Sequence, residues 1–362
     1  MRRRDFLRLA GMGAAAVSLG SAGAWCQARS GADKPNIIFI MVDDLGKEWV
    51  SCYGAEDIET PHIDALAAGG MRFENAYSMP QCTPSRVTLL TGQYPWRTGW
   101  VNHWDVPRWG VGYFDWRHHT TVAQLLKRAG YATAAAGKWQ INDFRVTPDA
   151  LKKHGFDEWC MWTGGEGGNP PSDERYWDPY IHTGHQSKTH KGKFGPDIYT
   201  QFLIDFAGRH KDEPMFLYFP MCLTHGPLVA TPDEPDVTEK TAKHKAMVRY
   251  MDKLVGQLVA ALERLIQDGE SKLKMLLRDE WDDIRVVAAE ALGYLGETEL
   301  ALETMQSVID GEETFATVAA LNALDYMMQA GQVSVKRIQA MVKGKRFKNV
   351  SGRVVDYFNA MT

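Results

Sequence analysis

The sequence predicts an α/β protein with a doubly wound, mostly parallel sheet flanked by helices and followed by an all-helical tail. The segments 35–44 and 214–221 each contain an unbroken apolar run with the composition of a buried parallel strand, and helical patterns alternate with them. After Ile266 the helical periodicity continues and no strand pattern returns. We therefore expect a sheet domain over 33–268 and a helical tail over 270–362.

The N-terminal segment has the composition of an export signal. An arginine triplet at 2–4 precedes Asp5-Phe6-Leu7, and a run of small and apolar residues follows over 9–24. That run is too short and too rich in glycine and alanine for a good membrane span, and the arginine–phenylalanine–leucine order resembles a twin-arginine signal. We predict a signal peptide over 1–28, passage through the twin-arginine machinery and a periplasmic or extracellular location. An uncleaved anchor is the alternative.

Composition narrows the function classes. The 362 residues are 44% hydrophobic and carry a formal net charge of −4, which gives no support for nucleic-acid binding. Four cysteines follow the predicted signal, and they have neither zinc-site spacing nor the density of a disulfide framework. One of them, Cys82, begins a predicted helix and needs an explanation of its own.

The helices of the sheet domain carry recognisable start and stop signals. The segment 60–73 has an apolar stripe that stops at a glycine pair, and 120–130 is capped and ends in glycine. In 83–92, Thr83 is the expected cap, proline occupies the first turn and glycine ends the helix. A strand is expected over 131–139 and a long amphipathic helix over 241–266.

Two parts of the chain have a less regular pattern. Residues 140–200 are rich in loops, and loops of this length often border a site. In the tail, Ala291-Leu292-x-Tyr294 recurs as Ala323-Leu324-x-Tyr326, a period of about 32 residues that is typical of helical repeats. We interpret the tail as HEAT-like, with ordinary helices of a C-terminal cap as the alternative.

Polar residues follow three of the predicted strands, where α/β sheets place their sites. These residues are Asp43-Asp44, Gly137-Lys138-Trp139 and Thr224-His225. Adjacent carboxylates suit a hard cation such as Ca²⁺, and the first turn of the helix at Cys82 favours an anion. Arg86 lies one turn along the same helix face as Cys82.

Taken singly, each residue also has an ordinary structural interpretation. The acidic pair can be a solvated turn, Lys138 and Arg86 can be surface cations, His225 can be structural, and Cys82 can be a buried thiol. The set becomes specific only when its members are considered together.

Considered together, these residues and their surroundings resemble the sulfatase family of the alkaline-phosphatase-like superfamily. Cys82-Thr83-Pro84-Ser85-Arg86 matches the family's Cys-x-Pro-x-Arg signature. PNIIFIMVDDLG, TPHIDALAAGGMRFENAYS, LLKRAGYATAAAGKW and LTHGPL match further family patterns in the family's order. The resemblance runs from about residue 35 to about residue 266.

The resemblance implies a reaction and a role for each residue. Cys82 would be converted by a maturation enzyme to Cα-formylglycine, whose hydrate supplies the nucleophile. Asp43, Asp44 and residue 82 would bind Ca²⁺. Arg86 and Lys138 would neutralise the sulfate, and His225 would protonate the leaving alcohol. Lys138, Gln140 and His225 would contact the substrate.

Two departures from the family pattern stand out. The family's Gly-Lys-Trp-His reads Gly-Lys-Trp-Gln here, so Gln140 replaces a histidine that the family uses to regenerate the aldehyde. The strand ending in Asp-Asn that would complete the metal site after Ile266 is absent from the pattern, so the sheet domain reads as truncated. We expect the loops at 93–118 and 140–195 to set substrate selectivity.

Three functions follow from the resemblance. The first is a Ca²⁺-dependent sulfuric ester hydrolase that acts on a sulfated carbohydrate or a similar ester. The second is a catalytically impaired sulfatase-like protein that lacks part of the metal site. The third is a phosphoester or phosphonate hydrolase of the same superfamily.

Overall fold

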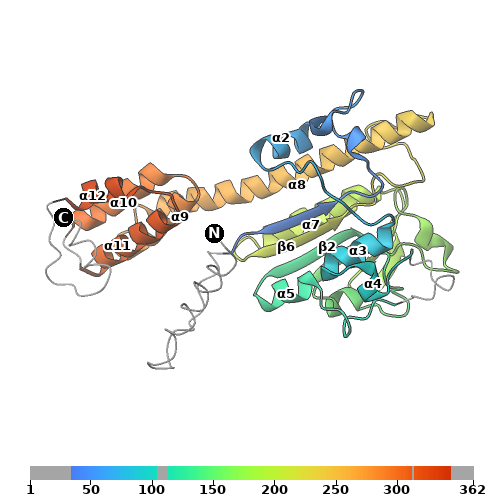
Figure 1. The fold of residues 1–362 in the computed structure, drawn as a ribbon, viewed down its shortest axis with the longest axis horizontal. Helices are drawn as coiled ribbons and strands as arrows, with labels where there is room; N and C mark the ends of the chain where they lie inside the picture. Colours follow the sequence, from blue (N-terminus) through green and yellow to red (C-terminus); the bar gives the residue numbers. More distant parts are fainter. Residues whose placement is uncertain (1–33, 104–112, 312–313, 344–362) are drawn as a thin grey trace, which may run out of the picture. The chain divides into compact units, whose positions relative to one another are not determined.

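The computed structural model describes residues 34–103, 113–311 and 314–343 (Figure 1). The predicted signal peptide over 1–28 lies outside these ranges. Within them, every helix is too short or too polar to qualify as a membrane span.

Six strands form one sheet in the order β1-β6-β2-β3-β4-β5. The first four strands in that order are parallel, and β4 and β5 form an antiparallel pair at the edge. The mostly parallel sheet predicted from the sequence is therefore confirmed. The strands are β1 (Ile37–Met41), β2 (Ala132–Lys138), β3 (Glu158–Trp162), β4 (Tyr180–Thr183), β5 (Gln186–Thr189) and β6 (Met215–Pro220).

Helices cover both faces of this sheet, as a doubly wound fold requires. Figure 1 shows them with α7 and α8 on the side opposite α3 and α5. They are α2 (Pro61–Gly69), α3 (Cys82–Thr91), α4 (Pro95–Thr98), α5 (Val122–Arg128), α6 (Ala150–Lys153), α7 (Gly195–Arg209) and α8 (Lys240–Leu276), with 3₁₀ turns at Lys47–Trp49, Ser51–Tyr53 and Pro170–Asp173.

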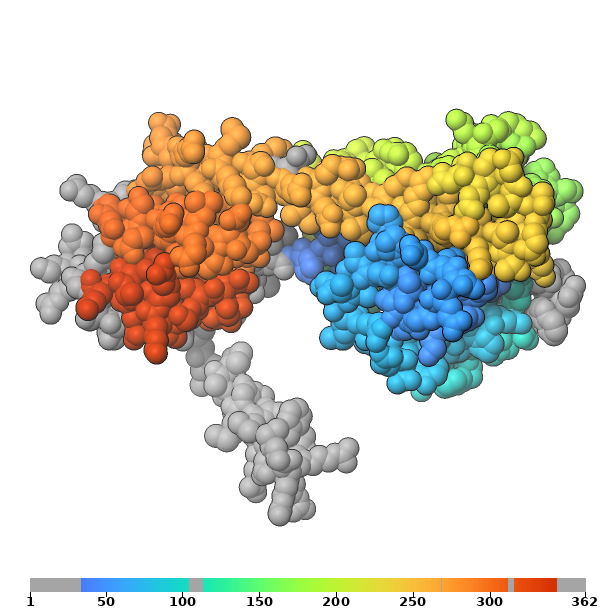
Figure 2. All heavy atoms as spheres, turned by 90° about the horizontal axis from the view of Figure 1, so that it is seen from above, coloured from blue at the N-terminus to red at the C-terminus, as the bar shows by residue number. Residues whose placement is uncertain are grey.

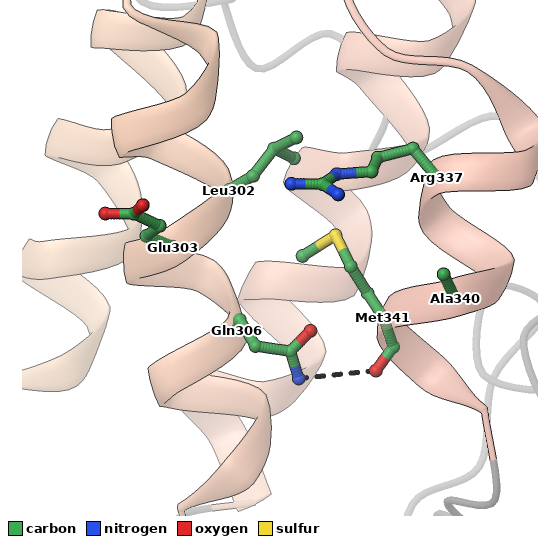
Figure 3. Close-up of a pocket in the computed structure, with 6 residues that line it drawn as sticks. All are labelled: Leu302, Glu303, Gln306, Arg337, Ala340 and Met341. Carbon is green, nitrogen blue, oxygen red and sulfur yellow. Dashed lines mark hydrogen bonds between the residues drawn. The ribbon is translucent and has the colours of Figure 1, made fainter.

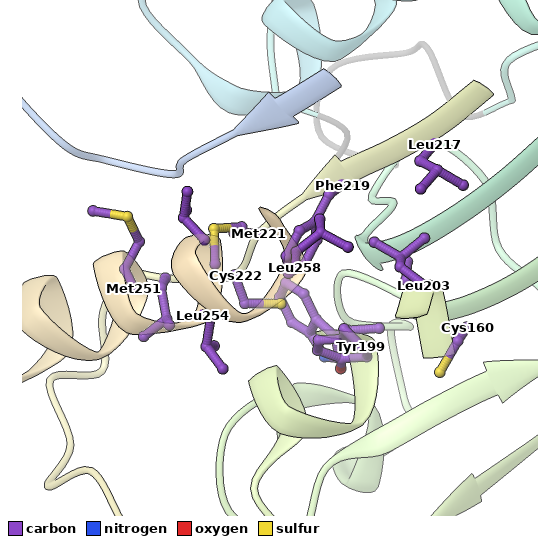
Figure 4. Packing of buried hydrophobic residues seen from close by; sticks show 14 of the residues in the cluster. Cys160, Tyr199, Leu203, Leu217, Phe219, Met221, Cys222, Met251, Leu254 and Leu258 are labelled. Carbon is purple, nitrogen blue, oxygen red and sulfur yellow. The ribbon is translucent and has the colours of Figure 1, made fainter. Parts of the chain in front are cut away.

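Alternating side chains of the central strands divide the core into two clusters. Leu217 and Phe219 of β6 pack with Leu203 of α7 and Leu254 of α8, as Figure 4 shows. Phe216 and Tyr218 of the same strand face the opposite cluster, to which α3 and α5 contribute. Because both faces of β6 are buried, its sequence is continuously apolar rather than alternating.

The helix that begins at the signature cysteine starts differently from the prediction. Gln81 is the N-cap of α3 and makes no side-chain cap hydrogen bond, so the expectation that Thr83 caps this helix is wrong. Thr83 lies in the first turn, and its hydroxyl instead donates to the carbonyl of Gln140 at 3.3 Å. This bond links the start of α3 to the segment that follows β2. Gly92 ends the helix in a left-handed conformation (φ 65°), as predicted.

The long helix α8 also anchors α2. The buried carboxylate of Asp252 on α8 accepts hydrogen bonds from the backbone N–H groups of His62 (3.2 Å) and Ile63 (2.9 Å) in the first turn of α2. The two helices lie against each other in Figure 2, with α2 in blue and α8 in yellow. A carboxylate at this position satisfies N–H groups that have no partner within α2.

The described part of the tail is wholly helical, as predicted. It contains α9 (Asp282–Tyr294), α10 (Thr298–Asp310), α11 (Thr314–Gln329) and α12 (Val335–Val342), packed around their own apolar cluster. Leu292 and Leu324, the leucines of the repeated motif, are both buried, whereas Tyr294 and Tyr326 are both exposed. The two copies of the motif thus present equivalent faces.

Candidate active site

The ends of β1 and β6 bring the acidic pair beside His225. Hydrogen bonding between the two segments continues past the strands, because Asp43 N donates to Leu223 O (2.8 Å) and Thr224 N donates to Asp43 O (2.7 Å). His225 Nε2 lies 3.5 Å from Asp44 Oδ2. The Asp44 side chain is 67% exposed, whereas Asp43 is buried, so this pair has one carboxylate facing solvent and one facing the protein.

Lys138 reaches Asp43 from the neighbouring strand. Its Nζ lies 2.5 Å from Asp43 Oδ2, and its side chain is fully buried. The preceding residue, Gly137, has φ 124°, and a Cβ there would lie 2.0 Å from the carbonyl oxygen of Pro220. Only glycine therefore lets β2 pass this close to the end of β6 and deliver the lysine to Asp43.

Arg86 completes this buried charge cluster from α3. Its Nη1 donates to the carbonyl of Lys138 (2.9 Å), and its Nη2 lies 3.5 Å from Asp43 Oδ2. Burial alone would raise the pKa of Asp43, but the charges of Arg86 and Lys138 outweigh it and hold that pKa below its ordinary value. Burial, together with the like charge of Arg86, lowers the pKa of Lys138.

Cys82 lies in the first turn of α3, one helical turn before Arg86. Burial alone would raise the pKa of its thiol, but a hydrogen bond from His103 and the charge of Lys138 outweigh burial and lower it. Cys160 and Cys222, in contrast, are buried thiols whose pKa burial raises to about 12. Cys82 is thus the described cysteine with the most nucleophilic surroundings.

His103 is a functional candidate that the sequence analysis missed. Its Nε2 lies 2.7 Å from Nε2 of Gln140, and it is close enough to Cys82 to lower the pKa of that thiol. It lies in the chain after α4, far in sequence from both partners, so no spacing pattern indicates it. Gln140 could have indicated it, because it stands where the family pattern has a histidine, and another histidine of the chain could lie nearby in the fold.

Arg175 is a second residue that the sequence analysis did not single out. Its Nη1 lies 3.0 Å from Nδ1 of His225, and its guanidinium lies over the Trp162 ring at 4.0 Å from the centroid. A cation stacked on tryptophan and bonded to a histidine has little freedom to move. Arg175 belongs to the loop-rich stretch between β3 and β4, which was expected to border a site.

The donor set for a cation is incomplete in the part of the chain that the structure describes. There, no three His, Cys, Asp or Glu side chains come together as a metal cluster. Asp43 and Asp44 supply two carboxylates, and one oxygen of Asp43 already faces Lys138. Ca²⁺ takes six to eight oxygens, so these two carboxylates alone supply too few ligands for a calcium shell.

The predicted residues therefore fall into two groups around Asp43. Arg86 and Lys138 contact it directly, and Cys82 lies near Lys138, whereas His225 and Asp44 lie together on the exposed side. A pocket of about 340 Å³ in the helical tail lies among other residues (Figure 3). Its lining is Leu302, Glu303, Gln306, Arg337, Ala340 and Met341, and it holds none of the residues that the sequence singled out.

Most of the sheet domain is similar in sequence to known proteins. The family model described as Sulfatase matches residues 35–271. The N-acetylgalactosamine-6-sulfatase of Canis lupus familiaris is 32% identical over 277 residues, which are 69% of this chain and 49% of that protein. The N-acetylgalactosamine-6-O-sulfatase of Bacteroides thetaiotaomicron is 46% identical over 136 residues, 35% of this chain and 26% of that protein.

A solved structure shares the fold. It is the crystal structure of Ps i-CgsB in complex with k-i-k-neocarrahexaose, 29% identical, with a TM-score of 0.56 over 65% of this chain and 56% of that chain. The chain spans about half the length of the curated relatives that it matches over most of its sheet domain.

Proposed function

The chain belongs to the sulfatase family, and we propose that it is a sulfuric ester hydrolase acting on a sulfated carbohydrate. The observation that carries this proposal is the Cys82 thiol at the start of α3, held beside two buried cations that share one carboxylate. Its relatives include sulfatases of N-acetylgalactosamine, and these support a sulfated sugar as the substrate class.

In this proposal the cationic side of the site binds the sulfate group. Arg86 and Lys138 supply positive charge next to residue 82, in surroundings from which water is largely excluded. Charged hydrogen bonds are stronger in such surroundings, so they favour the additional charge that develops on the ester oxygens in the transition state. Gln140, at the end of β2, adds an amide within reach of the same region.

The exposed side of the site handles the leaving group. His225 is partly exposed, and its Nδ1 lies 3.0 Å from Arg175 Nη1 and 2.7 Å from the carbonyl oxygen of Gly226, so Nε2 points toward Asp44 and the solvent. An imidazole in this position can give a proton to the departing alcohol of the sugar. The substrate therefore enters from the side of Asp44 and His225.

Two further components complete the proposal. Conversion of Cys82 to formylglycine by a maturation enzyme would provide an oxygen nucleophile at this position. Calcium, held by Asp43 and Asp44 with residue 82, would supply positive charge at the sulfate. Because the described residues supply only part of a calcium shell, water and substrate oxygens would complete it. Export through the twin-arginine route to the periplasm or beyond belongs to the same proposal.

One observation favours a second candidate, a sulfatase-like protein with impaired catalysis. The described residues after β6 contain no strand, so no further strand end brings metal ligands toward Asp43. A protein of this kind would keep the anion site without completing the reaction. A phosphoester or phosphonate hydrolase is the third candidate, since the same groups could bind a phosphoryl oxygen.

The test is to produce the chain together with a formylglycine-generating enzyme and to measure hydrolysis of an aryl sulfate and an aryl phosphate with added calcium. The tryptic peptide that contains residue 82 is analysed by mass spectrometry in the same preparation. Sulfate release that Cys82→Ala abolishes supports the proposal. A fully converted residue 82 with no sulfate release supports the impaired protein, and preferential phosphate release supports the third candidate.

A further inference from the structure

We propose that the free edge of β1 is an interaction surface, which pairs in antiparallel orientation with β1 of a second copy of this chain. The inference concerns association of the protein, and it holds whether or not the chain hydrolyses sulfate esters. The composition of the edge, the direction of its backbone groups and the charges at its two ends carry it.

The two edges of the sheet differ in composition. β1 lies at one edge and β5 at the other, and within the described residues β1 pairs with β6 alone (Figure 1, blue strand). All five residues of β1 are apolar, whereas β5 has the polar sequence Gln-Ser-Lys-Thr. Polar and charged side chains protect an exposed edge, because they discourage pairing with another chain. β5 has this protection and β1 does not.

The apolar side chains of β1 are covered only in part. All five are half-buried or exposed, with Phe39 36% exposed, whereas the residues of β6 are buried throughout. Ile38 and Ile40 pack against the cluster to which α7 and α8 contribute, and the Phe39 ring lies 6.2 Å from that of Tyr218. A further strand would cover the remaining apolar surface, since side chains of paired strands contact each other across the ladder.

The direction of the backbone groups gives this edge a defined ladder. Met221 N donates to Met41 O (2.8 Å), and Asp43 N donates to Leu223 O (2.8 Å). In a parallel ladder a residue directs its N–H and its C=O to the same side, and successive residues alternate. The odd-numbered residues therefore face β6, so Ile38 and Ile40 direct their N–H and C=O groups to the free edge. A strand along this edge would satisfy these groups.

An antiparallel pair centred on Phe39 fits the sequence of β1 to itself. In this register Ile38 lies opposite Ile40 of the second copy, and the two can exchange hydrogen bonds because both face the edge. Ile37 lies opposite Met41. Apolar residues thus meet apolar residues along the whole strand, which favours cross-strand pairing. The arrangement has two-fold symmetry, so association closes at two copies.

Charge selects this register and this partner. The centred register places Lys34 opposite Asp44 of the second copy, and the symmetry produces this pair twice. Both residues are exposed in the single chain. A shift of two residues in either direction would place Lys34 opposite Val42 or Gly46, and the complementarity would be lost. Because Asp44 borders the candidate active site, the second copy would add a cation beside that site.

The test measures the mass of the full chain by sedimentation equilibrium between about 1 and 100 µM, where a weak dimer with a micromolar Kd dissociates. The wild type should shift with concentration from 40.7 kDa to twice that mass. Ile38→Pro removes an edge-facing N–H and adds a ring that blocks the ladder, so it should raise Kd at least about 100-fold. Proline is tolerated on an edge strand when its nitrogen faces away from the neighbouring strand, so the fold should remain, which far-UV circular dichroism checks.

Charge reversal tests the register without proline. Lys34→Asp and Asp44→Lys each create two like-charged pairs in a homodimer, and each should raise Kd about tenfold or more. An equimolar mixture of the two variants should recover dimerisation, because every aspartate of one chain then faces a lysine of the other. Lys188→Asp is the matched control, since it makes the same charge change on the exposed edge strand β5. It should leave Kd within about twofold of the wild-type value.

Each outcome supports or overturns the proposal. A chain that stays at 40.7 kDa up to about 100 µM overturns it. Association that grows beyond two copies also overturns it, because pairing uses the only apolar edge of the described sheet. A dimer that survives both charge reversals unchanged overturns the assignment to β1, even if Ile38→Pro fails to fold. Folded variants that stay monomeric when mixed overturn the two-fold register. None of these measurements depends on sulfate release, so they leave the proposed function to its own test.

Discussion

Replacing Lys138 with methionine tests the electrostatic arrangement at the centre of the site. Methionine has a similar length and no charge, so Lys138→Met leaves the packing nearly filled and removes the partner 2.5 Å from Asp43 Oδ2. The Lys138 side chain is fully buried and Asp43 is 5% exposed, so water cannot replace the lost contact.

The structure sets the size of the effect. Removing one partner of a buried ion pair costs about 3–5 kcal/mol, because the remaining charge stays buried and unpaired. Arg86 still lies 3.5 Å from the same oxygen and compensates in part. We therefore expect Lys138→Met to lower the free energy of unfolding by about 3 kcal/mol at pH 7, at the lower end of that range.

The pH dependence follows from the direction of the Asp43 pKa. In the wild type it is lowered from 3.8, so the stability that Asp43 contributes is present above 3.8 and is lost as the pH falls through the folded value. In Lys138→Met, burial is opposed only by Arg86 and the smaller effect of His225, so the folded pKa of Asp43 rises. The stability difference between wild type and variant should therefore be largest at pH 7 and shrink as the pH falls toward 4.

Urea unfolding followed by tryptophan fluorescence at pH 7, 5 and 4 measures this difference. Lys127→Met is the matched control, because Lys127 pairs with Asp157 at the surface, and it should cost less than about 1 kcal/mol. Asp43→Asn combined with Lys138→Met should recover most of the loss, since it removes the unpaired charge. A loss in Lys138→Met no larger than the control's, or a difference that grows toward pH 4, would refute the reasoning.

Three further changes have defined outcomes. Gly137→Ala places a Cβ 2.0 Å from a backbone oxygen and should lower the free energy of unfolding by more than about 3 kcal/mol in the same urea assay. Gly167→Ala is the control: its Cβ would meet nothing within 4 Å, so the free energy of unfolding should hardly change. Thr121→Ala removes the capping box of α5 and should cost about 1–2 kcal/mol, whereas Thr121→Ser should keep most of the stability. Arg175→Ala removes one of the two partners of His225 Nδ1 and leaves the Gly226 carbonyl. It should lower kcat for aryl sulfates about 10- to 100-fold without changing the urea midpoint by more than a few tenths of a molar, and an unaltered kcat would contradict that role.

The sequence predicted the parts of the fold that depend on local pattern. The buried strands β1 and β6 were expected from their apolar runs, and the glycine that ends α3 was expected from its position after the helix. The long helix was expected to end near Ile266, but α8 continues to Leu276. Helical periodicity there passes into the tail without a stop signal, so sequence alone gave no reason for a particular end.

The missed strands have a physical reason as well. β4 and β5 are four residues each and lie at the edge of the sheet, and β5 is polar. A short edge strand is stabilised by pairing with its neighbour rather than by an apolar pattern of its own, so its sequence resembles a loop. The stretch over 140–200 was therefore interpreted as loop-rich, although it contains β3 and this antiparallel pair.

The residues of the site show the same difference between local sequence pattern and tertiary packing. Asp43, Lys138 and His225 were predicted because each lies at or just after the end of a strand, and strand ends converge at one edge of a parallel sheet. His103 and Arg175 come from loops whose course depends on tertiary packing. Their positions become visible only when the fold brings each beside a residue that the pattern had already identified.

The charges of the site bear on which ester it would take. Arg86 and Lys138 contact Asp43, and Arg175 contacts His225, which lies beside Asp44. The three cations and two carboxylates leave an excess of one positive charge before any metal binds. A sulfate monoester carries one negative charge at neutral pH, whereas a phosphate monoester carries close to two. In a buried site an uncompensated charge is costly, so this balance suits the singly charged ester. Bound calcium would shift the balance toward the doubly charged one. An incomplete calcium shell should therefore favour sulfate over phosphate, and the ratio of aryl sulfate to aryl phosphate turnover should fall as calcium is raised.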